Sequence, residues 1–156
     1  MNGSKLISAV YPADESNYTK GRAAKITEIT VHHMAGINTA AGCGAVFAAK
    51  GRNGSSHYGI GKAGEIAQYV SESDTAWANS NWESNCRAVT VEVSNDMKET
   101  PWHVSDESYA SLVRLVADIA ERNGLYPLVP GKNLTWHSMY AATACPGEYI
   151  LSRMGD

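Results

Sequence analysis

Apolar and polar residues alternate along two segments of the chain, and a period of two is typical of β-strands. Residues 26–33 (ITEITVHH) and residues 87–93 (RAVTVEV) both show this alternation. In the first segment Ile29 and Val31 fall on one face, and in the second the valines do. A shorter strand is expected over residues 134–137. We therefore expect strands that each pack one apolar face onto a core.

Residues 106–123 place apolar side chains at intervals of three and four, as one face of an α-helix does. Ser105 can cap the start of this helix, and Gly124 can end it. The apolar face that we expect in the core consists of Tyr109, Leu112, Val113, Val116 and Ala120.

The remaining sequence predicts shorter elements. Thr39 and Gly51 bracket a helix over residues 40–50. Residues 56–61 and 65–70 are typical of a hairpin, because a Lys-Ala-Gly turn separates two runs of strand-forming residues.

Two polar stretches complete the chain. Residues 1–24 are expected to form an N-terminal arm, and residues 71–87, with Trp77, are expected to form a loop. Because strands alternate with helices, the predicted fold is α/β, with one central mixed sheet flanked by helices. The length of 156 residues indicates a single domain over residues 1–156, with its core at about 25–154.

Composition excludes several classes of function. A net charge of −3 gives no basic footprint for nucleic acid or an anionic membrane, and no apolar run approaches the ~20 residues of a membrane span. The first residues lack a basic stretch followed by an apolar one, so we expect no signal peptide. Three cysteines do not pair evenly, which argues against a disulfide framework and leaves the roles of Cys43 and Cys86 open.

Candidate chemistry emerges when the strand faces are compared. Counting along the strands puts His32, Glu92 and His137 on the polar faces, opposite the valines. Cys145 follows His137 after seven residues. Two imidazoles and one thiolate suit a catalytic zinc, which keeps a further position for water. Since a carboxylate that is not a ligand can carry a proton, the pattern predicts metal-assisted amide hydrolysis.

Four blocks of sequence resemble the zinc-dependent N-acetylmuramoyl-L-alanine amidases of the type 2 amidase family. Peptidoglycan recognition proteins share the fold of that family. The resemblance extends from about Ile26 to Arg153. The blocks are VHHMAG (31–36), SSHYGIGKAGEIAQYV (55–70), RAVTVEVSN (87–95) and WHSMYAATACPG (136–147).

The resemblance implies a role for individual residues. His32, His137 and Cys145 would hold Zn²⁺, Glu92 would be the catalytic acid and base, and Thr143 would contact the substrate or its oxyanion. The implied reaction cleaves the amide bond between N-acetylmuramic acid and L-alanine in bacterial peptidoglycan, which lyses the cell wall. Peptidoglycan is then the expected partner.

Several residues allow two interpretations. His57 either contacts the substrate in its groove or is a structural strand histidine, and Trp77 either stacks on sugar rings or braces its loop. Thr143 could also bond only to the backbone of its own turn. His33 is expected on the opposite face from His32, in a structural role. The family's loop that often reads W-H-A-G reads Trp-Ala-Asn-Ser here, at residues 77–80.

We expect the catalytic domain of a phage or prophage endolysin, kept in the host cytoplasm until its release to the wall. A monomer is favoured, and any wall-binding domain lies outside this chain. Two alternatives remain: a module that binds peptidoglycan without cleaving it, and a zinc peptidase that acts on stem peptides.

Overall fold

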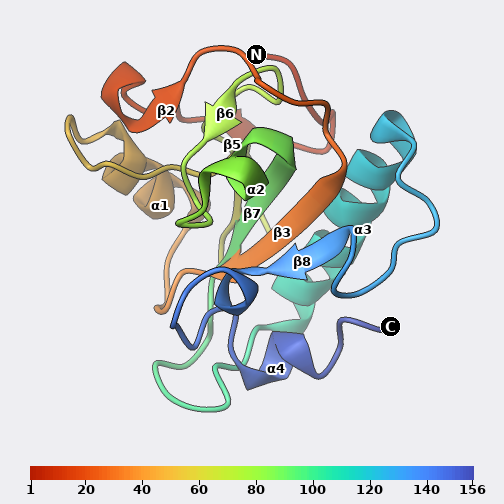
Figure 1. Cartoon of the computed structure of the whole chain (residues 1–156). Helices are drawn as coiled ribbons and strands as arrows, with labels where there is room; N and C mark the ends of the chain where they lie inside the picture. Colours follow the sequence, from red (N-terminus) through yellow and green to blue (C-terminus); the bar gives the residue numbers. More distant parts are fainter.

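A six-stranded mixed sheet forms the centre of the computed structural model, which describes all 156 residues (Figure 1). The strand order is β1-β5-β4-β7-β3-β8. Strands β4, β7, β3 and β8 run parallel, and β5 runs antiparallel to β4. The bounds are Ala9–Val10 (β1), Glu28–His33 (β3), Tyr58–Ile60 (β4), Ile66–Gln68 (β5), Ala88–Val93 (β7) and Leu134–Trp136 (β8).

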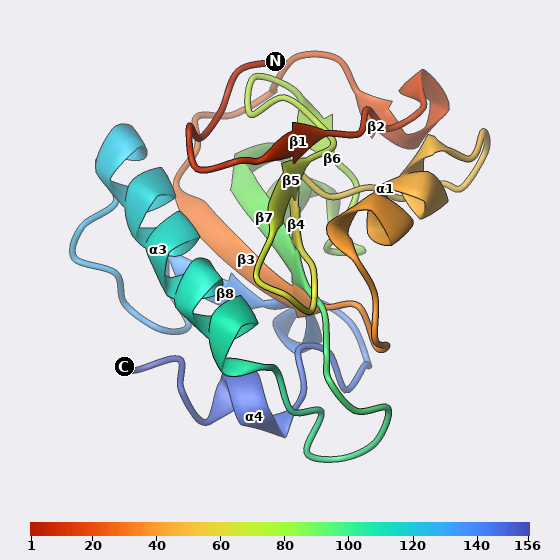
Figure 2. The same cartoon turned by 180° about the vertical axis from the view of Figure 1, so that it is seen from behind.

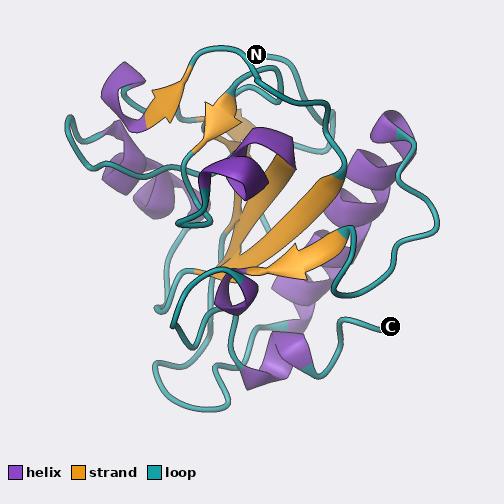
Figure 3. Cartoon of the chain, in the orientation of Figure 1, coloured by secondary structure: helices purple, strands orange, loops and turns teal.

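Helices flank this sheet, as the sequence predicts (Figure 3). A second, two-stranded sheet pairs β2 (Tyr18–Thr19) with β6 (Thr75–Ala76). No helix combines the length and the apolar character that crossing a membrane requires. The helices are α1 (Ala40–Ala48), α2 (Trp82–Arg87), α3 (Asp106–Asn123) and α4 (Glu148–Leu151), with short 3-10 turns at Glu15–Asn17 and His137–Met139.

Two apolar clusters cover opposite faces of the sheet. Helix α3 crosses one face (Figure 2), where Ile66 and the apolar residues of β3 and β7 pack against it. Helix α1 packs against β4 and β5 on the other face, where Ala67 belongs to the second cluster with Phe47. Ile66 and Ala67 are consecutive in β5, so their side chains point to opposite faces. The α1 side is the one that carries the polar strand residues.

The strand register confirms the parity predicted from sequence. His32 lies opposite Glu92, and Val31 lies opposite Val91. Thr30 is paired with Thr135 on β8. Because paired residues in neighbouring strands share a face, His32 and Glu92 lie side by side on the polar face.

The bounds of α3 agree with the prediction at both ends. Ser105 accepts a hydrogen bond from the backbone N–H of Ser108, and Gly124 ends the helix in the left-handed conformation with φ of 64°. The hairpin over β4 and β5 is also confirmed. One residue of the predicted apolar face was wrong: Val113 is 52% exposed, because it lies at the side of α3 and not under it.

Several other predicted bounds were wrong. Residues 71–87 are not all loop, because Asn81 caps the backbone N–H of Ser84 and starts α2, a helix too short to show apolar periodicity. The first helix ends at Ala48 rather than Lys50, since Ala49 is already extended. Strand β8 ends one residue early, and His137 begins a 3-10 turn.

Candidate metal centre and its cleft

A polar cleft of about 440 Å³ opens on the α1 side of the sheet. His32 and Glu92 each stand one residue before the carboxyl end of their strand, and His137 directly follows β8. Carboxyl ends of parallel strands are where open α/β sheets bind their ligands. The cleft is lined by these three residues together with Cys145, Trp77, Thr143 and others.

Three of the lining side chains form a compact set of possible metal ligands. The donor atoms of His32, His137 and Cys145 all lie within 4.8 Å of one another. His32 Nδ1 is 3.6 Å from Cys145 Sγ. A tetrahedral zinc with Zn–N of ~2.05 Å and Zn–S of ~2.3 Å separates such a pair by about 3.6 Å. The donor set therefore fits a zinc ion without rearrangement of this pair.

The protonation states of the two histidines favour ligation. Burial, and then the proximity of His137, lowers the pKa of His32 to about 3. Burial also lowers the pKa of His137 below its usual value. Both rings are therefore neutral at pH 7, and a neutral imidazole has the lone pair that a metal needs.

Cys145 is buried as a protonated thiol. Burial, with the nearby charge of Glu92, raises the pKa of its thiol well above the usual value. The backbone N–H of His33 lies 3.3 Å from Sγ and points at the sulfur. Since the metal ligand is the thiolate, binding of a cation at this site must displace the thiol proton.

Glu92 lies beside the three donors but is not one of them. Its Oε1 is 4.0 Å from His32 Nδ1, and its side chain is 17% exposed. Burial raises the pKa of Glu92 to about 8, an effect that the positive charge of Arg52 opposes. A carboxyl whose pKa lies near neutrality can both accept and donate a proton at physiological pH.

The loop before Cys145 brings Thr143 to the edge of the cleft. Thr143 is exposed, and its Oγ1 accepts a hydrogen bond of 3.2 Å from the backbone N–H of Cys145. It therefore both supports its turn, as the simpler interpretation holds, and presents a hydroxyl to the cleft.

Trp77 and His57 occupy different environments. Trp77 lines the cleft, and its Nε1–H donates to Thr19 Oγ1 at 2.9 Å, which holds the indole ring in place. His57 is fully buried and bonded to Thr90 and Arg22. It does not line the cleft, so its position disagrees with contact to a substrate and fits the alternative of a structural strand histidine.

His33 lines the cleft but is not part of the donor set. Its ring packs edge-on against Trp102, with ring centroids 4.9 Å apart, and its buried Nδ1 has no hydrogen-bond partner. The choice of His32 over His33 as the candidate ligand agrees with this geometry.

Two residues near the candidate metal centre were missed from the sequence. Asn79 is fully buried, and its Oδ1 lies 2.8 Å from His32 Nε2. Arg52 is exposed and lines the cleft within range of the charge on Glu92. Both belong to loops that have no periodic pattern, and only the departure of residues 77–80 from the family's loop marked either of them.

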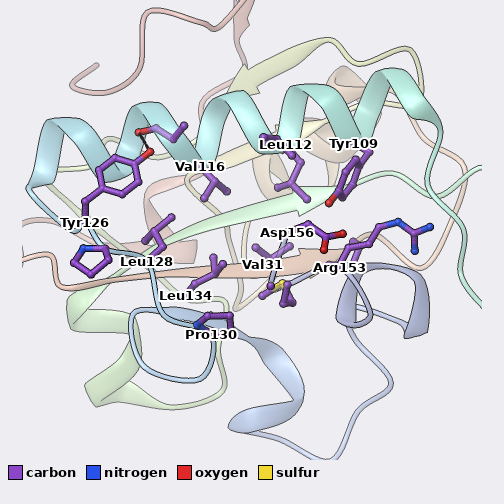
Figure 4. Close-up of a pocket in the computed structure, with 16 residues that line it drawn as sticks. Val31, Tyr109, Leu112, Val116, Tyr126, Leu128, Pro130, Leu134, Arg153 and Asp156 are labelled. Atoms are coloured by element: carbon purple, nitrogen blue, oxygen red, sulfur yellow. Dashed lines mark hydrogen bonds between the residues drawn. The ribbon is translucent and has the colours of Figure 1, made fainter.

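An apolar cavity of about 370 Å³ lies on the other face of the sheet, beneath α3 (Figure 4). Val31, Leu112 and Leu134 line it, and its charged groups, Arg153 and Asp156, lie together at one end (Figure 4). Apolar cavities of this size often bind ligands. It contains no cluster of metal-ligating side chains, however, so the candidate chemistry belongs to the polar cleft.

Comparison with protein families gives a match over most of the chain. The profile of the Amidase_2 family, described as N-acetylmuramoyl-L-alanine amidase, matches residues 22–148. A search of curated protein sequences finds no match.

Solved structures resemble the whole chain. AmpD superimposes with a TM-score of 0.76 at 19% identity, covering 97% of this chain and 93% of its own. The amidase LysC from Clostridium intestinale URNW superimposes with a TM-score of 0.70 at 18% identity, covering 97% of this chain and 95% of its own. A Drosophila PGRP-LB mutant in complex with tracheal cytotoxin superimposes with a TM-score of 0.69 at 14% identity, covering 94% of this chain and 89% of its own.

At such identities these structures establish the fold alone, which is that of peptidoglycan recognition proteins and type 2 amidases. The profile match covers most of the chain, including β3, β7 and the loop that carries Cys145. The chain therefore belongs to the N-acetylmuramoyl-L-alanine amidase family.

Proposed function

We propose that this protein hydrolyses the amide bond between N-acetylmuramic acid and L-alanine in peptidoglycan, and that a zinc ion held by His32, His137 and Cys145 takes part. One observation carries the proposal. Within a chain of the amidase family, three nitrogen and sulfur donors meet beside an unligated carboxylate at the carboxyl ends of parallel strands.

Each part of the site has a chemical task. A bound zinc supplies Lewis-acid chemistry, lowering the pKa of water and polarising a carbonyl. Glu92 takes the proton from the attacking water and delivers it to the nitrogen of the leaving L-alanine. The lactyl carbon gains the water oxygen and loses the amide nitrogen, so the products are a carboxylic acid and a free amine.

Thr143 and Trp77 are proposed to contact the substrate. The Thr143 oxygen already accepts the Cys145 N–H, so its own O–H remains free to donate to a carbonyl or oxyanion. Trp77 presents a ring fixed by its bond to Thr19, and a fixed aromatic surface binds a sugar or peptide with little loss of side-chain entropy.

Removal of one ligand tests the metal-dependent part. Cys145→Ser is expected to lower both the zinc content per chain and the lysis of purified walls to background. Undiminished lysis by this variant would contradict the proposal. If the wild-type protein sediments with walls but releases nothing, the chain is a binding module.

Glu92→Gln separates proton transfer from metal binding. General acid–base catalysis contributes roughly 10²–10⁴-fold, so turnover should fall by that factor. Zinc should stay at about one per chain because Glu92 is outside the donor set. Turnover that is unchanged would exclude Glu92 as the proton carrier.

A further inference from the structure

The second nitrogen of the His32 ring is held by a buried amide. His32 is 1% exposed, and Asn79, which is fully buried, places Oδ1 at 2.8 Å from Nε2. The other nitrogen, Nδ1, faces the cleft near Cys145 and Glu92. Which nitrogen carries the proton depends on which way the Asn79 amide is oriented.

Two hydroxyl groups determine which atom of the Asn79 amide faces Thr30. Thr135 Oγ1 donates to the backbone carbonyl of Ile29 at 3.2 Å. This bond uses the only proton of the Thr135 hydroxyl, so Thr30 must be the donor in the 2.8 Å hydrogen bond between Thr30 and Thr135. Thr30 Oγ1 can therefore only accept from Asn79 Nδ2, which lies at 3.0 Å.

The second hydrogen bond of the Asn79 amide leads through Ser84 to the carboxylate of Glu28. Asn79 Nδ2 lies 2.7 Å from Ser84 Oγ, and Ser84 Oγ donates to Glu28 Oε1 at 2.5 Å. Glu28 is 3% exposed and also accepts from Arg87 Nε at 2.8 Å and from the Tyr140 hydroxyl at 3.1 Å. Paired with a guanidinium, this carboxylate acts as an acceptor only, and Ser84 has to point its proton towards it.

Both protons of the Asn79 amide are therefore used in hydrogen bonds. The amide group cannot rotate by about 180° without losing both of them. Its oxygen must face His32, so Nε2 carries the proton and donates it. The lone pair of the neutral ring then lies on Nδ1, the atom that faces Cys145 Sγ at 3.6 Å.

We propose that Asn79 is a positioning residue that holds His32 as the Nε2–H tautomer with Nδ1 aimed at the metal site. The Glu28 carboxylate determines this orientation through Ser84. The inference rests on the proposed zinc site for its consequence, but the tautomer itself requires no metal. Groups that orient a metal-binding histidine typically change metal affinity by 10–100-fold when they are removed.

Zinc affinity measured by chelator competition is one test. Asn79→Leu removes the acceptor at similar volume and should weaken zinc binding by about 10–100-fold. Asn79→Asp restores an acceptor for Nε2–H and should bind zinc within about threefold of wild type. Asn17→Ala is the matched control, because Asn17 is an equally buried amide that bonds to Phe47, Ala49 and Asn53 instead.

Zinc binding by folded Asn79→Leu within about threefold of wild type would overturn the proposal. An equal loss in Asn17→Ala would also overturn it, since general packing would then explain the effect. If Asn79→Leu does not fold, the double variant Thr30→Val/Ser84→Ala serves in its place, because it removes both acceptors that orient the amide. Unchanged zinc affinity in this double variant would then contradict the role of Thr30, Ser84 and Glu28.

Nitrogen NMR of metal-free protein gives a readout independent of zinc and of activity. The His32 ring is expected as a single Nε2–H tautomer in wild type and as a mixture in Thr30→Val/Ser84→Ala. A mixture already present in wild type would contradict the inference. A single tautomer in a protein that binds no zinc would instead refute the proposed function and leave the hydrogen-bond network standing.

Discussion

At the scale of single residues, the three donors of the cleft differ in how ready they are for a metal ion. The two histidines are neutral at pH 7 because burial lowers the pKa of each. Cys145 is protonated, because burial and the charge of Glu92 raise the pKa of its thiol. Only one of the three donors therefore has to lose a proton when a metal binds.

This difference predicts the proton balance of zinc binding. In the Glu92→Gln variant at pH 7.5, zinc binding should release about one proton per ion, because the Cys145 thiol ionises while the histidines are already neutral and no carboxyl group beside the site can titrate. Zinc affinity should accordingly rise by roughly tenfold per pH unit around that value. Calorimetry in buffers of different ionisation enthalpy measures the number released.

Cys145→His, made in the same Glu92→Gln background, is the control for that measurement, since an imidazole is already neutral at pH 7.5. Its zinc binding should release close to no protons. Zinc binding by Glu92→Gln that releases none would show that the thiol is not a ligand.

Residue roles were predictable where strand periodicity fixed the direction of a side chain. His32 and Glu92 were placed on one face by parity alone, and the register confirms it. Asn79 was not predictable, because its position depends on the Asn81-capped turn that follows it. His57 was ambiguous because its alternating pattern could not show that Arg22, from the N-terminal arm, would cover it.

At the scale of elements, the loop after Cys145 depends on one glycine. Gly147 has φ of +87°, and a Cβ there would lie 2.6 Å from the Cβ of Trp102. Gly131 has a similar φ of +78° but open space around it. A side chain at Gly131 would meet only the cost of the backbone conformation, whereas one at Gly147 would meet that cost and a steric clash with Trp102.

Gly147→Ala is therefore expected to destabilise the protein by about 2–4 kcal/mol, through the combined conformational and steric cost. Gly131→Ala should lose only about 1 kcal/mol, from conformation alone. Urea denaturation of the two variants measures both losses. Equal losses would show that the packing of Trp102 on Gly147 does not constrain the loop.

Longer elements were the ones that sequence could predict. Helix α3 has both a capping serine and a terminal glycine around a periodic core, so its bounds were right at both ends. Helix α2 has six residues, with Trp82 more than half exposed, so no apolar pattern marks it. Strand β1 has two residues, and its pairing with β5 depends on tertiary contacts that local pattern does not contain.

At the scale of the whole molecule, a buried ion pair joins distant parts of the chain. Glu72 is 2% exposed and accepts two hydrogen bonds, of 2.8 and 2.7 Å, from Arg122 near the end of α3. The Tyr58 hydroxyl on β4 also donates to Glu72, and the backbone N–H of Ser4 in turn donates to Tyr58. The sheet, α3 and the N-terminal arm therefore meet at one carboxylate.

Arg122→Met should destabilise the protein by about 2–4 kcal/mol at pH 7, because it leaves a buried carboxylate without its charge partner. Asp118→Ala removes the other, more exposed partner of Arg122 and should cost under about 1 kcal/mol. Denaturation at pH 7 compares the two. Similar losses would mean that the Glu72 pair contributes no more than a surface pair.

The pH dependence of the same pair has a definite sign. Burial alone would raise the pKa of Glu72, but hydrogen bonds from Arg122 and Tyr58 bring it below its usual value of 4.5. A lowered pKa gives stability that is present above the unfolded value and is lost as pH falls through the folded one. In Arg122→Met, burial acts without the guanidinium and raises the pKa of Glu72, so the lone carboxylate is protonated at higher pH in the variant than in wild type. The difference in stability between wild type and Arg122→Met should therefore shrink as pH falls towards 4, and a constant difference would contradict this account.

The most direct test of the central claim is the mass of the fragments released from purified walls by the zinc-loaded protein. Cleavage at the proposed bond yields stem peptides with a free L-alanine amino terminus, and glycan strands that keep their lactyl carboxylates and carry no peptide. The account predicts these two products and no others. New amino termini within the stem peptide, with L-alanine still attached to the glycan, would contradict it and identify a peptidase.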